Sequence, residues 1–515
     1  MRDLSRTFLI ASSLTASLLG GCAGMRSARS AADWVEVRTE DVLLKTDLSE
    51  SSARRVATRM QSTHDVFSNL WFGCAFEGGR DRPIEVTLLE NSAAFHATVG
   101  RAVGGVFATI DLLGEDVSRI VVTDEDREFA ARIFQHELTH VLVARCVPRA
   151  PTWLDEGMAS FLETAIVEDG TVVVGVPPYV FVDRTYGGSF AANGIPIVGV
   201  PREDRIAPRS LVAIPAADFY GDLDVAYGPE ADARLARYAS ASALVRAFEL
   251  DADSAHEAFA SFVAELASGS DTAASLERLL GQVDLDALVA AEPSPSTVID
   301  LAFEPPPPGR IDVRAMTVAE AHLELALLGS GRNRVESVIE HSLAAILDPS
   351  VRGRAHLILA DEASVQGDLE ESRAWIDRGL ALDPDDPDLL RARIYDFVRR
   401  RASADDAARD ALRDDVRRLG LVARSASAFA TIAEAHLVLG EDAAAFAQSE
   451  RALTLDPDSF HALAVNALAN ARRARYGEAL VAIERAIARS GHRTSGTYLT
   501  RIRDEIRARA AGRTR

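Results

Sequence analysis

The chain has 515 residues, which is too many for one ordinary domain, so two or three domains are expected. Hydrophobic residues make up 48% of it and charged residues 26%, which is typical of folded globular proteins and excludes disordered and polytopic membrane chains. The formal net charge of −21 argues against nucleic acid as a partner, because a polyanion would be repelled.

The N-terminus has the pattern of an export signal. Arg2 and Arg6 precede an apolar stretch over residues 8 to 19, which is too short to span a bilayer comfortably. The sequence LGGC at positions 19 to 22 then resembles the lipobox of bacterial lipoproteins. The alternative is a plain secretory signal that is cleaved nearby.

The lipobox resemblance implies that residues 1 to 21 are a signal peptide and that Cys22 becomes the lipidated N-terminus. Residues 22 to 32 then form a tether, and the lipid anchor at Cys22 attaches the protein to the membrane of a bacterial cell envelope. Ala23 follows the cysteine in place of aspartate, so delivery to the outer membrane is expected in a Gram-negative cell. In an exported protein the two remaining cysteines, Cys74 and Cys146, either pair or stay as buried thiols.

Residues 33 to 292 predict one α+β domain in which strands come first and helices follow. The predicted strands cover residues 34–38, 42–45, 84–89, 106–112, 119–122 and 171–174. The predicted helices cover residues 49–70, 93–99, 127–147, 153–165, 230–250, 253–268 and 272–280. Residues 293 to 312, which include four consecutive prolines, predict a linker between domains.

Residues 313 to 495 show internal repetition. Gly367 lies seventeen residues before Pro384, and Gly440 lies seventeen residues before Pro457. The two segments resemble tetratricopeptide repeats, which implies an all-α solenoid whose groove binds a protein partner. Four repeats and an irregular fifth over residues 391 to 425 are expected, and a non-repetitive helical bundle is the alternative.

The last twenty residues, 496 to 515, are rich in arginine and predict a basic helical tail. Asp504 and Glu505 interrupt the basic run. A solvated helix end is therefore favoured over a contact with phosphate or lipid.

The segment with the clearest chemistry is the HELTH sequence at residues 136 to 140, inside a predicted apolar helix. His136 and His140 are four residues apart, so both imidazoles lie on one face of a helix and can bind one metal ion. Glu137 is displaced around the helix toward a metal-bound water, and it is the candidate general base.

A catalytic zinc has three protein ligands, so a third ligand is expected from a neighbouring element. The sequence WLDEGMA at residues 153 to 159 supplies Glu156 on a second helix, after a connection short enough to fold back. HELTH followed by WLDEGMA resembles the peptidase MA-like gluzincins, a family of zinc metallopeptidases. The resemblance assigns His136, His140 and Glu156 as ligands of Zn²⁺ and implies a zincin-like fold.

Two further site residues are candidates. Asp155 is either a partner for the second ring nitrogen of a histidine ligand or a solvated acid in the first turn of its helix. Related gluzincins provide a tyrosine or histidine that binds the oxyanion, and this chain offers Tyr220, Tyr227 and Tyr238. Tyr238 is preferred as the catalytic residue, because the small residues after it resemble the helix that follows the metal motif, although a core tyrosine is the alternative.

These patterns together predict a zinc metallopeptidase that hydrolyses peptide bonds at the cell envelope, with repeats that recruit a peptide or protein substrate or another partner. The alternative function is a repeat-based scaffold or assembly lipoprotein with an inactive or structural metal site. Glu137 favours the peptidase, because a structural site needs no acid beside an open coordination position. Peptidoglycan amidase and small-molecule hydrolase activities remain open.

Overall fold

The structure is a computed structural model of the whole chain. It describes the following residues: 33–73, 83–90, 105–111, 113, 116–123, 127–147, 150–168, 170–175, 205–220, 229–250, 254–291, 298–303, 309–330, 334–400, 406–457, 459–489 and 495–512. The predicted signal peptide and tether, the predicted lipidation site Cys22, Cys74, Tyr227 and the helix predicted over residues 93–99 lie outside the described residues.

The N-terminal half contains a mixed six-stranded sheet in the order β4-β5-β3-β2-β1-β9. Its strands are β1 (Val35–Arg38), β2 (Val42–Thr46), β3 (Ile84–Leu89), β4 (Gly105–Asp111), β5 (Asp116–Thr123) and β9 (Asp312–Ala315). The central pairs β2–β3 and β3–β5 are parallel, whereas the outer pairs are antiparallel. The strand predictions are confirmed for all five N-terminal strands.

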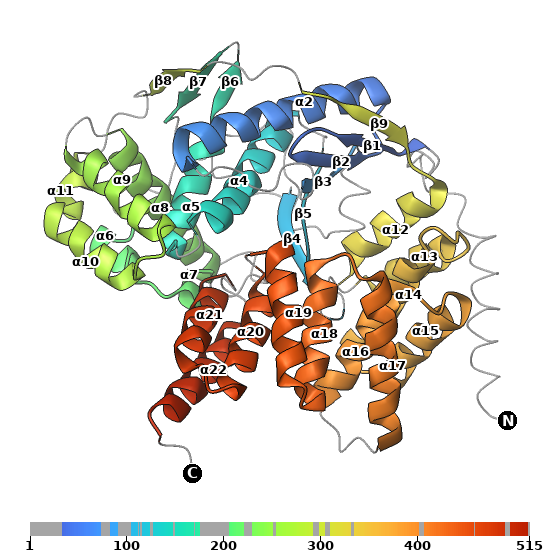
Figure 1. Cartoon of the computed structure of the whole chain (residues 1–515). Helices are drawn as coiled ribbons and strands as arrows, with labels where there is room; N and C mark the ends of the chain where they lie inside the picture. Colours follow the sequence, from blue (N-terminus) through green and yellow to red (C-terminus); the bar gives the residue numbers. More distant parts are fainter. Residues whose placement is uncertain are drawn as a thin grey trace.

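The two faces of this sheet are covered by different parts of the chain (Figure 1). Helices α2 (Glu50–Phe67) and α4 (Arg127–Cys146) pack on one face, where Val86 and Leu88 join the main hydrophobic core. Leu89 and Val121 point the other way and pack with residues of α12 (Val318–Gly329). Side chains alternate between the faces of a strand, so one short sheet serves two cores.

A second, three-stranded antiparallel sheet has the order β6-β7-β8, with β6 (Ile166–Glu168), β7 (Thr171–Val174) and β8 (Ile299–Ala302). Between β7 and β8 along the chain lie α6 (Pro208–Leu211), α7 (Ala216–Tyr220), α8 (Pro229–Glu249), α9 (Ser254–Ala267), α10 (Thr272–Gln282) and α11 (Leu285–Ala290). The helices predicted over 230–250, 253–268 and 272–280 are thus confirmed.

The prediction of a linker over residues 293 to 312 needs correction, because one strand lies inside this range and a second strand begins at its last residue. Strand β8 pairs with β7, and Asp312 begins β9, which pairs with β1. The alternation of half-buried and exposed residues along Ile299–Ala302 is the pattern of an edge strand. The neighbouring proline run obscured this signal in the sequence.

The C-terminal half is a row of helix pairs: α12–α13, α14–α15, α16–α17, α18–α19 and α20–α21. Their bounds are α13 (Val335–Ala345), α14 (Arg352–Val365), α15 (Leu369–Leu382), α16 (Pro387–Arg400), α17 (Asp406–Val422), α18 (Ala426–Leu439), α19 (Asp442–Leu455), α20 (Phe460–Arg472) and α21 (Tyr476–Arg489). The first helices of successive pairs contact one another in order, and we call α12, α14, α16, α18 and α20 the inner helix layer. The segment that was predicted to be irregular forms most of α16 and α17.

The tail predicted as a solvated basic helix is only partly so. Helix α22 (Ser495–Ala510) buries Leu499, Ile502 and Ile506 against the last helix pair. These apolar residues recur every three or four positions between the arginines, so they form one face of an amphipathic helix. The tail therefore covers the end of the helix array.

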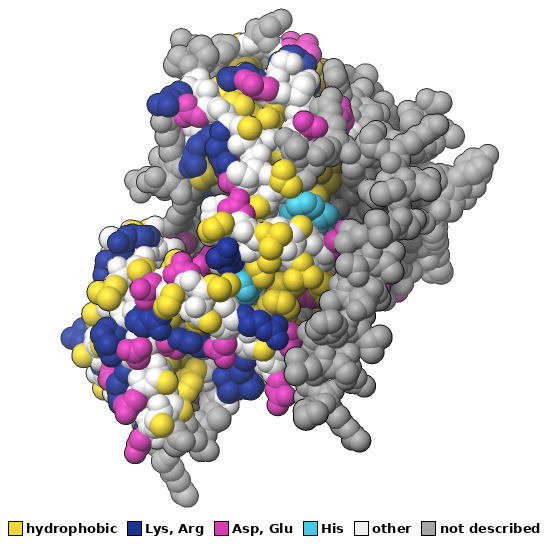
Figure 2. Space-filling model, turned by 90° about the vertical axis from the view of Figure 1, so that its right-hand side faces the viewer, with side chains coloured by type: hydrophobic (Ala, Val, Ile, Leu, Met, Phe, Trp, Pro, Cys, Tyr) yellow, Lys and Arg dark blue, Asp and Glu magenta, His cyan; other side chains and the backbone are white. Residues whose placement is uncertain are grey.

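Acidic and basic side chains are intermixed on the face of the helix array that Figure 2 shows. Charged side chains of neighbouring helices also pair with one another, as Arg393 of α16 does with Asp415 of α17 at 2.7 Å.

In the described part of the chain, no helix is both long enough and apolar enough to cross a membrane.

Candidate metal site

The candidate site lies between α4 and α5 (Thr152–Leu162), which pack against each other. His136 and His140 are one turn apart on α4, and Glu156 faces them from the second turn of α5. Glu156 is only 3% exposed, so its carboxylate is held inside the protein. The structure thus brings together the three residues that the sequence singled out as metal ligands.

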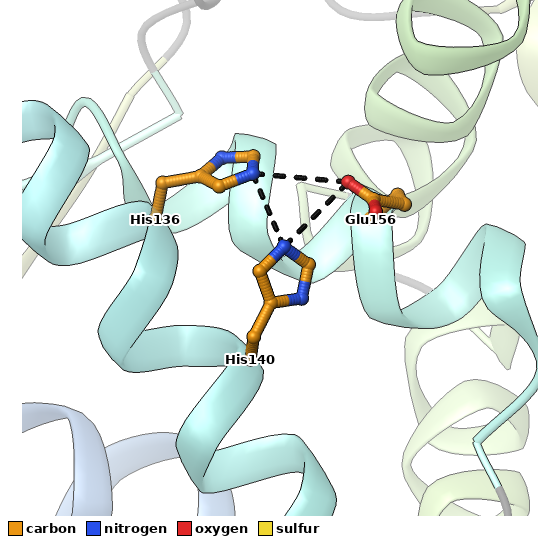
Figure 3. A group of neighbouring side chains, drawn as sticks. All are labelled: His136, His140 and Glu156. Atoms are coloured by element: carbon orange, nitrogen blue, oxygen red, sulfur yellow. Dashed lines mark hydrogen bonds and ion pairs between the residues drawn. The ribbon is translucent and has the colours of Figure 1, made fainter. Parts of the chain in front are cut away.

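The three side chains point their donor atoms at one centre (Figure 3). The Nε2 atoms of His136 and His140 are 3.2 Å apart, and each is 3.7 Å from Oε2 of Glu156. Ligand atoms bonded tetrahedrally to zinc at about 2.0–2.1 Å are about 3.3–3.4 Å from one another. The triangle is therefore close to the size expected for ligands of one metal ion, with its two longer sides about 0.3 Å above the tetrahedral zinc value.

The chemistry of the donors also fits a cation. Oε2 of Glu156 is buried and has no hydrogen-bond partner among the described residues, although nearly all buried polar atoms have one. Two imidazole nitrogens and one carboxylate oxygen are a common ligand set of catalytic zinc. A cation at the centre would satisfy all three donors together.

A second cluster of similar composition consists of Asp41, His64 and Asp65. Among the described residues, its carboxylates have hydrogen-bond partners, unlike Oε2 of Glu156. The side-chain amide of Gln61 donates to Oδ2 of Asp41 at 2.8 Å and to Oδ1 of Asp65 at 2.7 Å. Both carboxylates are therefore satisfied by a neutral group. The cluster ties α2 to the turn between β1 and β2 without needing a metal ion.

Each histidine of the site uses its second ring nitrogen to donate to a carboxylate. Nδ1 of His140 is 2.8 Å from Oδ1 of Asp155, and Nδ1 of His136 is 2.8 Å from Oε2 of Glu163. A carboxylate can only accept, so Nδ1 carries the proton and the Nε2 lone pair faces the centre. Asp155 is thus in contact with the histidine rather than free in solvent.

The sequence analysis missed Glu163, which lies at the C-terminal cap of α5. It follows Glu156 by seven residues, or two helical turns, so both acids lie on the face that α5 turns toward α4. This spacing was the available signal. The seven-residue spacing identifies Glu163 only once α5 is known to extend to its C-terminal cap at residue 163.

The acids around the site set its electrostatics. Burial lowers the pKa of His140, but the carboxylates of Asp155 and Glu156 outweigh burial and raise it well above its usual value. Burial also opposes protonation of His136, whose pKa is nevertheless raised, chiefly by the hydrogen bond that it donates to Glu163. Burial raises the pKa of Glu156, and the two histidines offset this only in part. The site therefore favours positive charge at its centre.

Glu137, the candidate general base, is next to His136 on α4 and is half-buried. Its charge contributes to raising the pKa of both histidines and of Tyr238. Glu137 therefore acts on the imidazoles and on this tyrosine through its charge, and it is not one of the three converging donors.

Two of the three tyrosine candidates lie beside the site. The hydroxyl of Tyr220, at the end of α7, hydrogen-bonds to the carboxylate of Glu156, whereas Tyr238 of α8 packs edge-on against Phe219 at a centroid distance of 5.7 Å. Burial, followed by the charge of Glu156, raises the pKa of both hydroxyls. Tyr220 thus contacts a ligand directly, which the sequence did not predict.

Gly157 explains why the second motif needs a glycine. A Cβ atom at this position would lie 2.8 Å from the backbone oxygen of Ala241 and 2.5 Å from Cγ2 of Val245. Helix α5 therefore approaches α8 more closely than any side chain would permit, which seats Glu156 next to Tyr238 and Tyr220.

Cys146, the last residue of α4, is disulfide-bonded. Cys146 is therefore not a buried free thiol, which is the alternative that the sequence allows for this residue. The other two cysteines of the chain lie outside the described residues.

No known family model matches this chain, and no curated protein matches it either. Its function must therefore be inferred from the geometry and chemistry of the site itself.

Proposed function

We propose that this protein is a zinc-dependent peptidase in which His136, His140 and Glu156 hold the metal ion and Glu137 is the general base. The observation that carries the proposal is the triangle of converging donors, with a carboxylate behind each imidazole and an unpartnered oxygen on Glu156. Bound zinc would polarise the scissile carbonyl and lower the pKa of a water molecule.

The residues of the chain have separate tasks in this reaction. Glu137 takes a proton from the water whose oxygen bonds to the carbonyl carbon, and it delivers that proton to the amine nitrogen as the carbon–nitrogen bond breaks. Asp155 and Glu163 keep Nδ1 of each histidine protonated, so that both Nε2 atoms stay available as ligands. No covalent bond between enzyme and substrate is needed.

A tyrosine hydroxyl would stabilise the negative charge that develops on the carbonyl oxygen. Tyr238 remains our candidate, because the charges of Glu156 and Glu137 both raise its pKa and because its ring packs against Phe219, the residue before Tyr220. Tyr220 is better suited to orient Glu156, to which it already donates a hydrogen bond.

The fold around the site is compatible with a zincin-like peptidase. Helix α4 packs against β4 and β5, and β4 is the edge of the six-stranded sheet. An extended peptide substrate would bind by adding a strand to this edge. We expect the helix pairs to be tetratricopeptide repeats and the protein to be anchored to the cell envelope through a lipid on Cys22.

Elemental analysis and a cleavage assay with a broad peptide library test the proposal on protein lacking residues 1 to 22. The wild type should contain one zinc ion per chain and cleave peptides. Glu156→Ala should lose zinc, whereas Glu137→Gln should keep zinc and lose activity by about a hundredfold or more. Glu168→Gln is the matched control, because this acid lies on the exposed strand β6.

Absence of zinc from the wild type, or cleavage that survives Glu137→Gln, would refute the peptidase assignment. Zinc binding without any cleavage would leave a structural metal site, and the repeat-based scaffold would then become the better proposal.

A further inference from the structure

The turn between β4 and β5 docks on the inner helix layer of the C-terminal half. Leu113, at this turn, is 8% exposed and belongs to the same buried cluster as Leu357 of α14 and Leu390 of α16. Nearly 250 residues separate the turn from these helices in the sequence, so the contact exists only in the folded chain.

Two buried charged side chains of the inner helix layer hold the backbone of this residue. The backbone N–H of Leu113 donates to Oδ1 of Asp361 at 3.3 Å, and its carbonyl accepts from Nη1 of Arg391 at 2.8 Å. Asp361 is 5% exposed and Arg391 is 2% exposed. Burying charges is costly unless they are hydrogen-bonded, so these contacts stabilise a defined arrangement rather than a chance encounter.

The backbone of Leu113 supports the same interpretation. Its φ of +46° lies in the left-handed region, which is uncommon for a residue with a large side chain. Such a conformation persists only where the surroundings hold it in place. Here the surroundings include the two hydrogen bonds and the apolar cluster of the helix array.

The same hairpin packs against the helix that carries two residues of the metal site. Among the strands that the structure describes, β4 pairs with β5 alone, and both strands pack against α4, which carries His136 and His140. An edge strand has one free side, so its position depends strongly on what holds its ends.

We propose that Asp361 and Arg391 are positioning residues, which hold the β4–β5 hairpin and thereby set the edge strand β4 against α4, the helix that carries His136 and His140. The inner helix layer then binds a segment of its own chain at α14 and α16 and is part of the catalytic unit. The consequence for substrate binding rests on the peptidase function proposed above. The docking of the hairpin on the inner helix layer does not depend on that function.

Other contacts make the same interface rigid. Glu324 of α12 is 4% exposed and lies against three neighbouring strands. Its carboxylate accepts from Lys45 at 3.1 Å and from Thr87 at 2.6 Å, and it pairs with Arg119. The helix array therefore meets the sheet at two places, its face and the end of its β4–β5 hairpin.

Hydrogen exchange on the zinc-loaded full-length protein tests the proposal without requiring an assay of activity. Arg391→Gln and Asp361→Ala should speed exchange in peptides covering β4 by about tenfold or more, as expected for loss of a buried hydrogen bond to a charged group. Arg393→Gln is the matched control, because Arg393 lies on the same helix but pairs with Asp415. It should leave β4 unchanged.

Leu113→Gly is a milder variant that keeps the turn and both backbone hydrogen bonds while removing the buried side chain. It should also speed exchange in β4, and all four variants should retain one zinc ion. Unchanged exchange in β4, or an equal effect of Arg393→Gln, would overturn the proposal.

The peptide cleavage assay supplies the second measurement. Arg391→Gln should raise KM for peptides more than it lowers kcat, because β4 would bind substrate while zinc and Glu137 stay in place. A fall in kcat with unchanged KM would overturn the proposed link between hairpin and substrate. A wild type that cleaves nothing would refute the peptidase function, and exchange in β4 would still decide the docking.

Discussion

Removal of Glu163 should weaken zinc binding without unfolding the protein. Oε2 of Glu163 lies 2.8 Å from Nδ1 of His136, and both side chains are 20% exposed, so solvent screens this contact only in part. A hydrogen bond to a charged group contributes about 1.5–3 kcal/mol. We therefore expect Glu163→Ala to lose about 2 kcal/mol of zinc-binding free energy, or about thirtyfold in affinity.

A series of variants separates charge from hydrogen bonding at this position. Glu163→Gln keeps an acceptor oxygen and loses the charge, so it should lose only about fivefold in affinity. Asp155→Ala should resemble Glu163→Ala, because Asp155 makes the equivalent contact with His140 at the same distance. Glu168→Ala removes a nearby exposed acid that contacts neither histidine, and it should bind zinc like the wild type.

Competition with a chelating dye at constant pH measures these affinities. Thermal unfolding of the zinc-free proteins shows whether each variant still folds. If Glu163→Ala binds zinc within twofold of the wild type while remaining folded, the carboxylate does not support the ligand, and our reasoning about the second ring nitrogen is wrong.

Three further predictions concern stability. Glu324→Ala should lower the free energy of unfolding in urea by about 3 kcal/mol, because Lys45 and Arg119 lose their buried partner and keep only Glu85, whose side chain is 35% exposed. Burial and the charge of His322 lower the pKa of His341 to about 4, below its ordinary value near 6.5. The free energy of unfolding should therefore be at its full value above about pH 6.5 and should fall by about 2–3 kcal/mol as the pH drops toward 4. His341→Asn should remove this pH dependence. Gly157→Ala should cost about 1–3 kcal/mol and weaken zinc binding, because α5 must move away from α8.

Two of these predictions have a matched control within the chain. Glu336 is exposed on α13, and Glu336→Ala should change stability by less than about 0.5 kcal/mol. Gly281 of α10 has open space around it, so Gly281→Ala should be neutral or stabilising. Equal losses from Glu324→Ala and Glu336→Ala would contradict the buried network. A wild type whose free energy of unfolding does not change between pH 7 and 5 would contradict the prediction for His341. A Gly157→Ala variant as stable as the wild type would contradict the prediction for Gly157.

The sequence was informative wherever the decisive spacing is local. The four-residue separation of His136 and His140 places both imidazoles on one face of any helix, whatever surrounds it. Alternating apolar residues likewise predicted β1 to β5, and a period of three or four predicted the helices that carry the site. Such patterns depend on the geometry of one element, so they can be read without knowing its neighbours.

Contacts between distant elements could not be read in this way. Glu163 and Tyr220 were missed or passed over because their roles depend on how α5 and α7 pack around Glu156. The strands β8 and β9 were missed because the proline run between them obscures their short patterns and because their partners, β7 and β1, are distant in the sequence.

The docking of Leu113 on Asp361 and Arg391 is the clearest case of a feature that only the tertiary structure decided. No local pattern marks these three residues, because their hydrogen bonds join segments that are about 250 to 280 positions apart. The sequence therefore determined which side chains can bind a metal ion. The packing of the sheet against two sets of helices determined what supports those side chains and which strands pack against the helix that carries them.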